Sequence, residues 1–126
     1  MSDSETAIVA YDGDSLYSTT LDRVEVVELH EKWGEPASQK VSSLSEHSPG
    51  VNKILLLDND EKKLNCRVRP RLEEVAKEYG CVVTQAIPTM LELLPSGCSK
   101  AKGVQMICMH LGIDPASQLM SIVSGL

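Results

Sequence analysis

The sequence predicts an α/β fold, in which an α+β layer is followed by one returning helix and strand. Short apolar runs of strand length alternate with segments whose apolar residues recur at helical spacing. The chain has 126 residues, of which 42% are apolar, so it suits one domain with a sizeable core. It has one Trp, three Tyr and no Phe, so that core must be aliphatic.

The first expected element is a buried strand over residues 7–11, because this short apolar run is bounded by polar residues. The following Asp12-Gly13-Asp14 is typical of a turn, and residues 16–20 are expected to return as the second strand of a hairpin. From Thr20 the apolar spacing becomes helical. The predicted helix covers about three turns and stops before Gly34.

Residues 38–50 are rich in serine and poor in apolar residues, which predicts an irregular connection. Residues 53–57 are continuously apolar after Lys53, as expected of a strand buried on both faces. Residues 58–60 supply side chains that can cap a helix over 61–68, and Pro70 is expected to interrupt that helix or to restart it as a first-turn residue.

The second half continues the alternation. Leu72, Val75, Ala76 and Tyr79 form a helical stripe that ends at Gly80, and strands are expected over 81–86 and 90–94. Ser99 is the predicted cap of a helix that ends at Gly112. Its expected inner face consists of Val104, Ile107, Cys108 and Leu111. A short helix over 115–118 and a last strand over 119–123 complete the prediction.

Charge is uneven along the chain. The formal net charge is −6, which disfavours a nucleic-acid partner because phosphate binding needs a basic face. Residues 1–63 carry 13 acidic and 6 basic side chains, a balance of −7, against 5 and 6, a balance of +1, in residues 64–126. An anionic ligand is therefore expected near the basic residues of the second half, which are Arg67, Arg69, Arg71, Lys100 and Lys102. A solvated helix face explains the three arginines among them more simply.

The N-terminal residues are acidic where a secretory or import segment needs bases, and no apolar run reaches the length of a membrane span. We therefore expect a soluble intracellular protein with no membrane partner, and cytoplasm and plastid are not distinguished. Neither cysteines nor histidines have the spacing of a metal site or a disulfide framework, so we expect reduced, mostly buried thiols. The residues concerned are Cys66, Cys81, Cys98, Cys108, His30, His47 and His110.

The most specific pattern lies between Met90 and Ile122. An apolar strand containing Glu92 is followed by Pro95-Ser96-Gly97-Cys98-Ser99-Lys100, a helix, and Leu111-Gly112-Ile113. This order resembles the Cof-type branch of the haloacid dehalogenase-like phosphatases. Residues 53–58 with the elements after them resemble that family's α/β cap, and residues 11–14 are similar to the entry of the cap in plant members. The resemblance thus predicts a cap-like domain over 1–94 and a partial, truncated return to the hydrolase core over 95–126, an incomplete form of the family fold.

The resemblance implies hydrolysis of a small phosphorylated metabolite through an aspartyl-phosphate, with Mg²⁺ and a catalytic lysine that neutralises the transferring group. Lys100 matches that lysine. By position alone Lys100 is more simply a solvated residue in the first turn of a helix, and the surrounding loop motif favours the catalytic interpretation. The glycine that follows the lysine in the family is Ala101 here.

Two further motifs of the family, Asp-x-Asp-Gly-Thr and Gly-Asp-x-x-Asn-Asp, are missing from the sequence. Asp12 with Asp14, and Asp58 with Asp60, imitate the first motif after an apolar strand, yet neither pair is followed by Gly-Thr. We interpret them as turn and helix-cap carboxylates. The sequence therefore predicts a fragment that is inactive by itself and binds no Mg²⁺ alone. The alternative is a non-catalytic α/β binding or interaction module.

Overall fold

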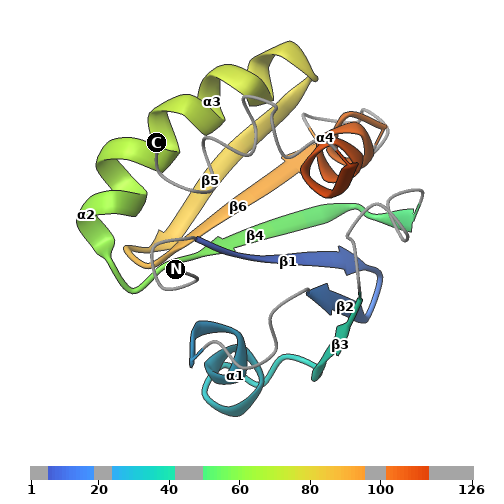
Figure 1. Cartoon of the computed structure of the whole chain (residues 1–126), viewed down its shortest axis with the longest axis vertical. Coiled ribbons are helices and arrows are strands. Elements are labelled where there is room, and N and C mark those ends of the chain that lie inside the picture. Colours follow the sequence, from blue (N-terminus) through green and yellow to red (C-terminus); the bar gives the residue numbers. More distant parts are fainter. Residues whose placement is uncertain (1–5, 19–23, 42–49, 96–101, 114–126) are drawn as a thin grey trace.

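Six strands form one sheet in the computed structural model, which describes residues 6–18, 24–41, 50–95 and 102–113 (Figure 1). The sheet order is β3-β2-β1-β4-β6-β5, and all neighbours are antiparallel except the parallel pair β2 and β3. The strands are β1 (Ala7–Asp12), β2 (Ser15–Ser18), β3 (Ser38–Lys40), β4 (Lys53–Leu57), β5 (Cys81–Ile87) and β6 (Met90–Pro95).

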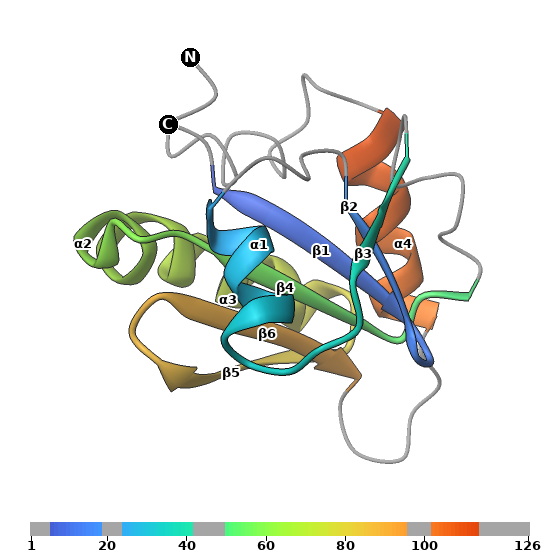
Figure 2. The same cartoon turned by 90° about the horizontal axis from the view of Figure 1, so that it is seen from below.

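Helices cover both faces of this sheet. On one face lie α4 (Lys102–Ile113) and a continuous helix built from α2 (Glu61–Lys63), the π-helical turn η3 (Leu64–Val68) and α3 (Arg69–Glu78). The opposite face carries α1 (Val24–Glu31), as Figures 1 and 2 show. Among the described helices none is long and apolar enough to cross a membrane. The α/β class expected from the sequence is confirmed.

Strand β4 belongs to both halves of the core. Ile54 and Leu56 pack with the residues under α3 and α4, while Leu55 and Leu57 pack with Val26 and Leu29 of α1. All four β4 leucine and isoleucine side chains are at most 3% exposed. The prediction of a strand buried on both faces is therefore confirmed, and its continuous apolar run follows from this position.

The helix after β4 begins and continues for identifiable reasons. The Asp60 side chain accepts a hydrogen bond from the Lys63 backbone N–H at 3.1 Å, as expected of a helix cap. Pro70 has no N–H and would crowd the carbonyl four residues earlier in a regular α-helix. The π-helical turn η3, in which the Arg69 N–H donates to the Leu64 carbonyl, widens the helix just before it. Pro70 accordingly occupies the first turn of α3, one of the two expected outcomes.

Most other elements agree with the sequence. The hairpin of β1 and β2, the stop at Gly80 (φ +69°), and the buried Val104, Ile107 and Cys108 of α4 are as expected. The irregular connection predicted over 38–50 is wrong at its start, because residues 38–40 pair with β2 as β3. Backbone pairing at a sheet edge needs no apolar side chains, so the serine-rich composition hid this strand. Helix α4 also runs one residue past Gly112.

Several predictions lie outside the described residues: the cap at Ser99, the helix over 115–118 and the strand over 119–123. The division into residues 1–94 and 95–126 stays a prediction. Within the described part, α4 shares one core cluster with β4, β6 and α3.

The start of α4 approaches the turn between α3 and β5 very closely. A Cβ atom at Gly103 would collide with the Tyr79 backbone carbonyl and would meet the Cys81 Sγ at 3.0 Å. Because a carbonyl in a turn moves less readily than the end of a side chain, only glycine fits here without displacing α4.

We expect Gly103→Ala to lower the free energy of unfolding by about 1–3 kcal/mol through overpacking. In a helix without this contact the same change would instead stabilise by about 1 kcal/mol. Urea denaturation of the wild-type and Gly103→Ala proteins shows whether the free energy of unfolding falls or rises. Gln105→Ala, in the same helix, is a near-neutral control. A stabilised Gly103→Ala protein would show that α4 does not rest against this turn.

Candidate functional site

Asp58 lies at the end of β4 and is surrounded by partners. It is 3% exposed. Its Oδ2 accepts a hydrogen bond from the Thr6 hydroxyl at 3.1 Å and lies 2.7 Å from the Lys63 ammonium, and its Oδ1 accepts the Asp60 backbone N–H at 2.9 Å. A carboxylate held in this way stabilises the junction of β1, β4 and α2 and is not available as a nucleophile. The interpretation of Asp58 and Asp60 as structural carboxylates is confirmed.

Asp12 and Asp14 lie in a different part of the sheet. Asp12 ends β1, pairs with Ser15 across the hairpin and packs its carboxylate against Gly50, while Asp14 is exposed in the turn. Antiparallel pairing of Ala7 with Leu57 puts Asp12 and Asp58 at opposite ends of the two strands, about 20 Å apart along the strand direction. The two aspartate pairs therefore do not form one site.

The remaining sequence-predicted residues are scattered. Lys100, Cys98 and His47 lie outside the described residues, and the side chain of His110 is not described. Cys66 is exposed, while Cys81 and Cys108 are buried, and all three are free thiols. Burial raises the pKa of Cys81 and raises that of Cys108 to about 12, so both stay protonated. The His30 Nδ1 lies 2.6 Å from the Glu35 backbone carbonyl at the surface.

The described residues contain no group of side chains arranged as metal ligands. In residues 6–18, 24–41, 50–95 and 102–113, no three His, Cys, Asp or Glu side chains are grouped as metal ligands. Mg²⁺ prefers oxygen ligands arranged around an octahedron, usually with one or two carboxylates available to it. Asp58 is already bound by Lys63 and Thr6, and Asp12 has no second carboxylate among its described contacts.

A polar cluster that the sequence did not indicate lies on the α1 face, at the end of β1. The Tyr11 hydroxyl donates to the Glu35 Oε1 at 2.8 Å, and the Lys53 ammonium lies 4.3 Å from the centre of the Tyr11 ring. Burial, the hydrogen bond to Glu35 and the negative charges of Glu35 and Glu92 all raise the pKa of Tyr11. Tyr11 therefore remains a protonated hydrogen-bond donor across the physiological pH range.

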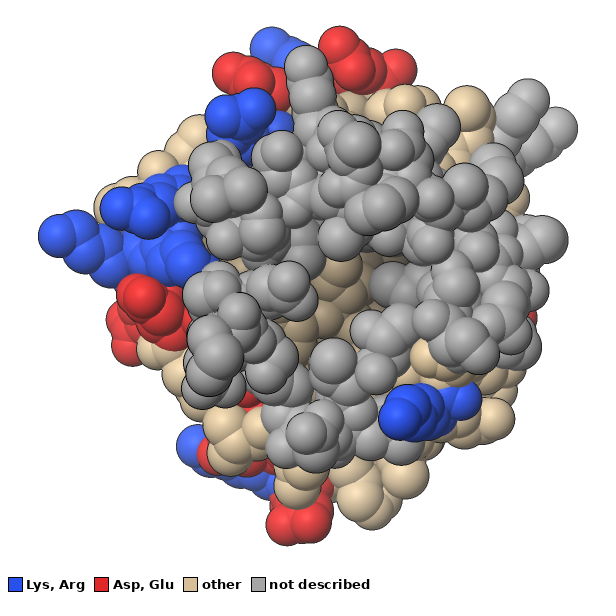
Figure 3. Space-filling view, in the orientation of Figure 1, with Lys and Arg blue, Asp and Glu red and all other residues tan. Residues whose placement is uncertain are grey.

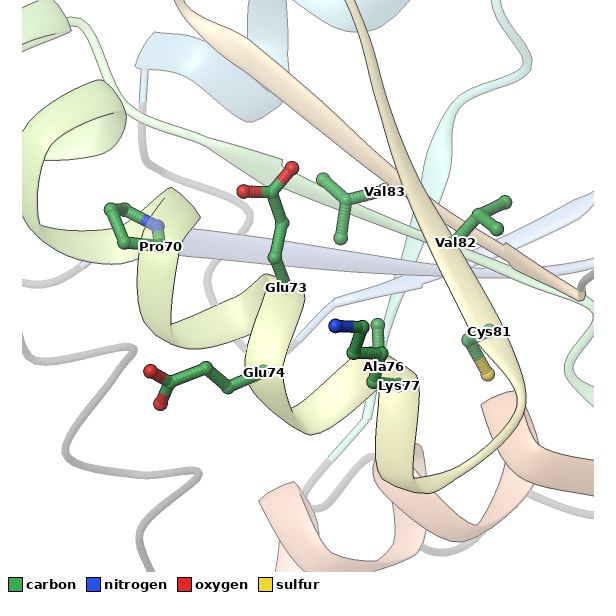
Figure 4. Close-up of a pocket in the computed structure, with 8 residues that line it drawn as sticks. All are labelled: Pro70, Glu73, Glu74, Ala76, Lys77, Cys81, Val82 and Val83. Atoms are coloured by element: carbon green, nitrogen blue, oxygen red, sulfur yellow. The ribbon is translucent and has the colours of Figure 1, made fainter.

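A groove of about 530 Å³ lies between α3 and β5 (Figure 4). Glu73 and Lys77 point from α3 toward the strand, and Glu74 points away. Glu73 already forms a 3.4 Å ion pair with Arg69, and the Cys81 thiol donates to the Tyr79 carbonyl at 3.6 Å. A protonated thiol and a paired carboxylate offer little chemistry, so this groove is a packing boundary at the sheet edge rather than a reaction site.

Sequence reasoning missed the Tyr11 cluster and the groove because both depend on contacts between distant segments. Tyr11 and Glu35 are 24 residues apart, and α3 and β5 meet only after the turn at Gly80. One local signal was present: Tyr11 follows the alternation of Ala7 and Val9, which predicts that its ring is buried on the same face.

Comparison with known proteins assigns a family. A family model described as haloacid dehalogenase-like hydrolase matches residues 1–122. The chain is also 33% identical over 109 residues to the chloroplastic endoribonuclease YBEY of Arabidopsis thaliana. The aligned segment covers 85% of this chain and 18% of that protein.

Solved structures share the same fold. TM0651 from Thermotoga maritima aligns with a TM-score of 0.63 and 27% identity, covering 81% of this chain and 37% of that one. A haloacid dehalogenase-like hydrolase from Bacteroides thetaiotaomicron aligns with a TM-score of 0.59 and 21% identity over the same shares of the two chains. The chain thus spans little more than a third of the length of these structures and less than a fifth of the length of the plant protein.

Lys63→Met is expected to lower the free energy of unfolding by about 3 kcal/mol, because it leaves the buried Asp58 carboxylate without its cation. Glu73→Ala, which removes the exposed pair with Arg69, should change it by less than about 1 kcal/mol. The double variant Asp58→Asn/Lys63→Met should recover part of the loss in a double-mutant cycle followed by urea denaturation. If Lys63→Met and Glu73→Ala both lowered the free energy of unfolding by the same small amount, the Asp58–Lys63 pair would be solvated.

Tyr11→Phe is expected to lower the free energy of unfolding by about 1 kcal/mol at pH 8, because it removes the hydrogen bond to Glu35. The raised pKa means that the unfolded phenol ionises first. The wild-type protein therefore loses stability above pH 10, at about 1.4 kcal/mol per pH unit, and Tyr11→Phe lacks this loss. Urea denaturation at pH 8 and pH 11 measures the difference between the two proteins. A difference that does not shrink at the higher pH would contradict the raised pKa.

Proposed function

The chain belongs to the haloacid dehalogenase-like hydrolases, and we propose that it is part of a Cof-type phosphatase that hydrolyses small phosphorylated metabolites. The family match over residues 1–122 is the observation that carries this proposal. The name of the Arabidopsis relative describes a protein of which this chain spans 18%, and we do not carry the ribonuclease activity over.

Lys100 is the residue of this chain to which we assign a catalytic role. Its segment connects Pro95, the last residue of β6, with Lys102, the first residue of α4. A lysine just before a helix is attached to a rigid element, and the positive end of the helix favours an anionic group nearby. Strand β6 is paired on both sides, with β4 and β5, which supports the rigidity of this attachment.

The proposed chemistry transfers a phosphoryl group to a carboxylate and then to water. The carboxylate oxygen forms a bond to phosphorus as the ester oxygen leaves with its electron pair and is protonated, and water later hydrolyses the acyl phosphate. The Lys100 ammonium neutralises negative charge that develops on the phosphoryl oxygens.

We assign neither the nucleophile nor the metal ligands of this reaction to the described residues. Asp58 is held by Lys63 and Thr6, and no metal-binding group forms among residues 6–18, 24–41, 50–95 and 102–113. We therefore route no step through Mg²⁺ on this chain. The proposal assigns the attacking carboxylate and the metal to other parts of a longer parent protein.

A second candidate function is a non-catalytic binding or interaction module. The structural use of Asp58 and Asp60 favours it, because the carboxylates that best imitate a nucleophile motif are committed to a helix junction. The two candidates differ in whether Lys100 affects turnover in the parent protein.

The purified chain is expected to hydrolyse p-nitrophenyl phosphate no faster than background, with or without Mg²⁺, because groups that act as one unit lose nearly all activity when members are missing. Asp12→Asn, Asp58→Asn and Lys100→Ala should change nothing in this assay. In the parent protein, Lys100→Ala should lower kcat at least about 100-fold, and Lys102→Ala should not. Mg²⁺-dependent turnover by the chain alone, abolished by either aspartate change, would place the nucleophile here. An unaffected kcat in the parent would favour the binding module.

A further inference from the structure

The turn between α3 and β5, residues 79–81, is adjacent to both ends of the segment that connects β6 with α4. Before that segment, Cys81 pairs across the strand ladder with Pro95, the last residue of β6. After it, the backbone of Gly103 in the first turn of α4 lies against the Tyr79 carbonyl and the Cys81 thiol. One short piece of backbone therefore holds both the end of β6 and the start of α4. We call residues 79–81 the anchoring turn.

The anchoring turn is itself fixed by the elements on either side of it. The Tyr79 backbone N–H donates to the carbonyls of Val75 and Ala76 at 3.3 and 3.2 Å, which ties the turn to the end of α3. Cys81 is 6% exposed and belongs to the same core cluster as Val104 of α4. Because close-packed interiors transmit displacements, the turn provides α4 with a rigid surface rather than a yielding one.

Covalent geometry keeps Lys100 close to this contact. Lys100 precedes Lys102, the first residue of α4, by two positions. Two residues of extended chain span at most about 7 Å, so the Cα atom of Lys100 lies within that distance of the Cα atom of Lys102. A charged group that stabilises a transition state must be oriented closely, since a misplacement on the order of 1 Å can lower a rate about 100-fold. The position of the α4 start therefore constrains where the ammonium group can lie.

We propose that the anchoring turn positions Lys100 for catalysis, and that Gly103 is the residue that permits the close contact. This inference rests on the proposed function. A Cβ atom at Gly103 would overlap the Tyr79 carbonyl oxygen, whereas real Cβ atoms stay at least 3.0 Å from such a neighbour. A side chain at this position thus forces the α4 start away from the turn. Gly103, Tyr79 and Cys81 are positioning residues, which act on the reaction through Lys100.

The test is a double-mutant cycle on kcat in the parent protein, with p-nitrophenyl phosphate as substrate. Gly103→Ala should lower kcat about 10- to 100-fold, because it displaces the α4 start by on the order of 1 Å. In a Lys100→Ala background the same change should lower kcat less than about twofold, since no ammonium remains to be misplaced. A purely structural role of Gly103 would give the same loss in both backgrounds.

Val26→Ala is the control for a loss of stability alone. It removes a buried side chain in the core cluster on the opposite face of the sheet, and should leave kcat within about twofold of the wild-type value. Circular dichroism verifies that each variant is folded at the assay temperature. If Gly103→Ala does not fold, Cys81→Val crowds the same contact from β5. It should lower kcat more than Cys66→Val, a change at an exposed cysteine, and only while Lys100 is present.

Two results overturn the inference and leave the proposed function intact. In the first, Lys100→Ala lowers kcat and Gly103→Ala does not. In the second, Gly103→Ala lowers kcat equally with and without Lys100. An unchanged kcat in Lys100→Ala itself is a different result, which overturns the proposed function and the inference together.

Discussion

Burial of β4 on both faces is the constraint on which the rest of this structure depends. A strand whose alternate side chains enter two cores must be covered twice, so α3 and α4 have to lie on one side of the sheet and α1 on the other. The strand ends in Asp58, whose carboxylate binds Thr6 before β1 and Lys63 in the next helix. One short segment thereby fixes the neighbouring strand, the two layers of helices and the direction of the helix that follows.

Much of this architecture was predictable from local patterns. The run Ile54 to Leu57, the capping side chain of Asp60 and the stop at Gly80 each carry their information within a few residues. Strand β3 was not predictable, since Gln39 and Lys40 pair through their backbones and leave their side chains in solvent. Neither was the contact of Tyr11 with Glu35, or that of Gly103 with the Tyr79 carbonyl, because only the folded sheet brings those segments together. For the candidate site, the sequence correctly indicated structural aspartates, while the assignment of Lys100 rests on the loop motif alone.

Charge in this molecule is better described by position than by sum. Acidic side chains dominate the N-terminal half, yet Asp58, the most buried of the described ones, is matched by a lysine at 2.7 Å, and Glu35 receives the Tyr11 hydroxyl. Exposed charges of both signs remain on the α2–α3 helix, where Lys62, Arg67 and Arg71 lie beside Glu61, Glu74 and Glu78. Figure 3 shows Lys and Arg side chains next to Asp and Glu side chains on the side of the molecule occupied by α2 and α3. The chain therefore presents different electrostatic surfaces in different directions, which a net charge of −6 does not convey.

The π-helical turn lets the helix hold one more residue without changing which of its faces is buried. A single residue inserted into a helix would normally rotate everything on one side of it by about 100° and move buried side chains into water. Here the extra residue is absorbed locally, so that Leu64 and Leu72 both remain in the core while Pro70 is accommodated. The π-helical turn and Pro70 are thus accommodated together in one continuous helix. An alignment with relatives that keep a regular helix must therefore open a one-residue gap inside a helix, where gaps are ordinarily penalised most.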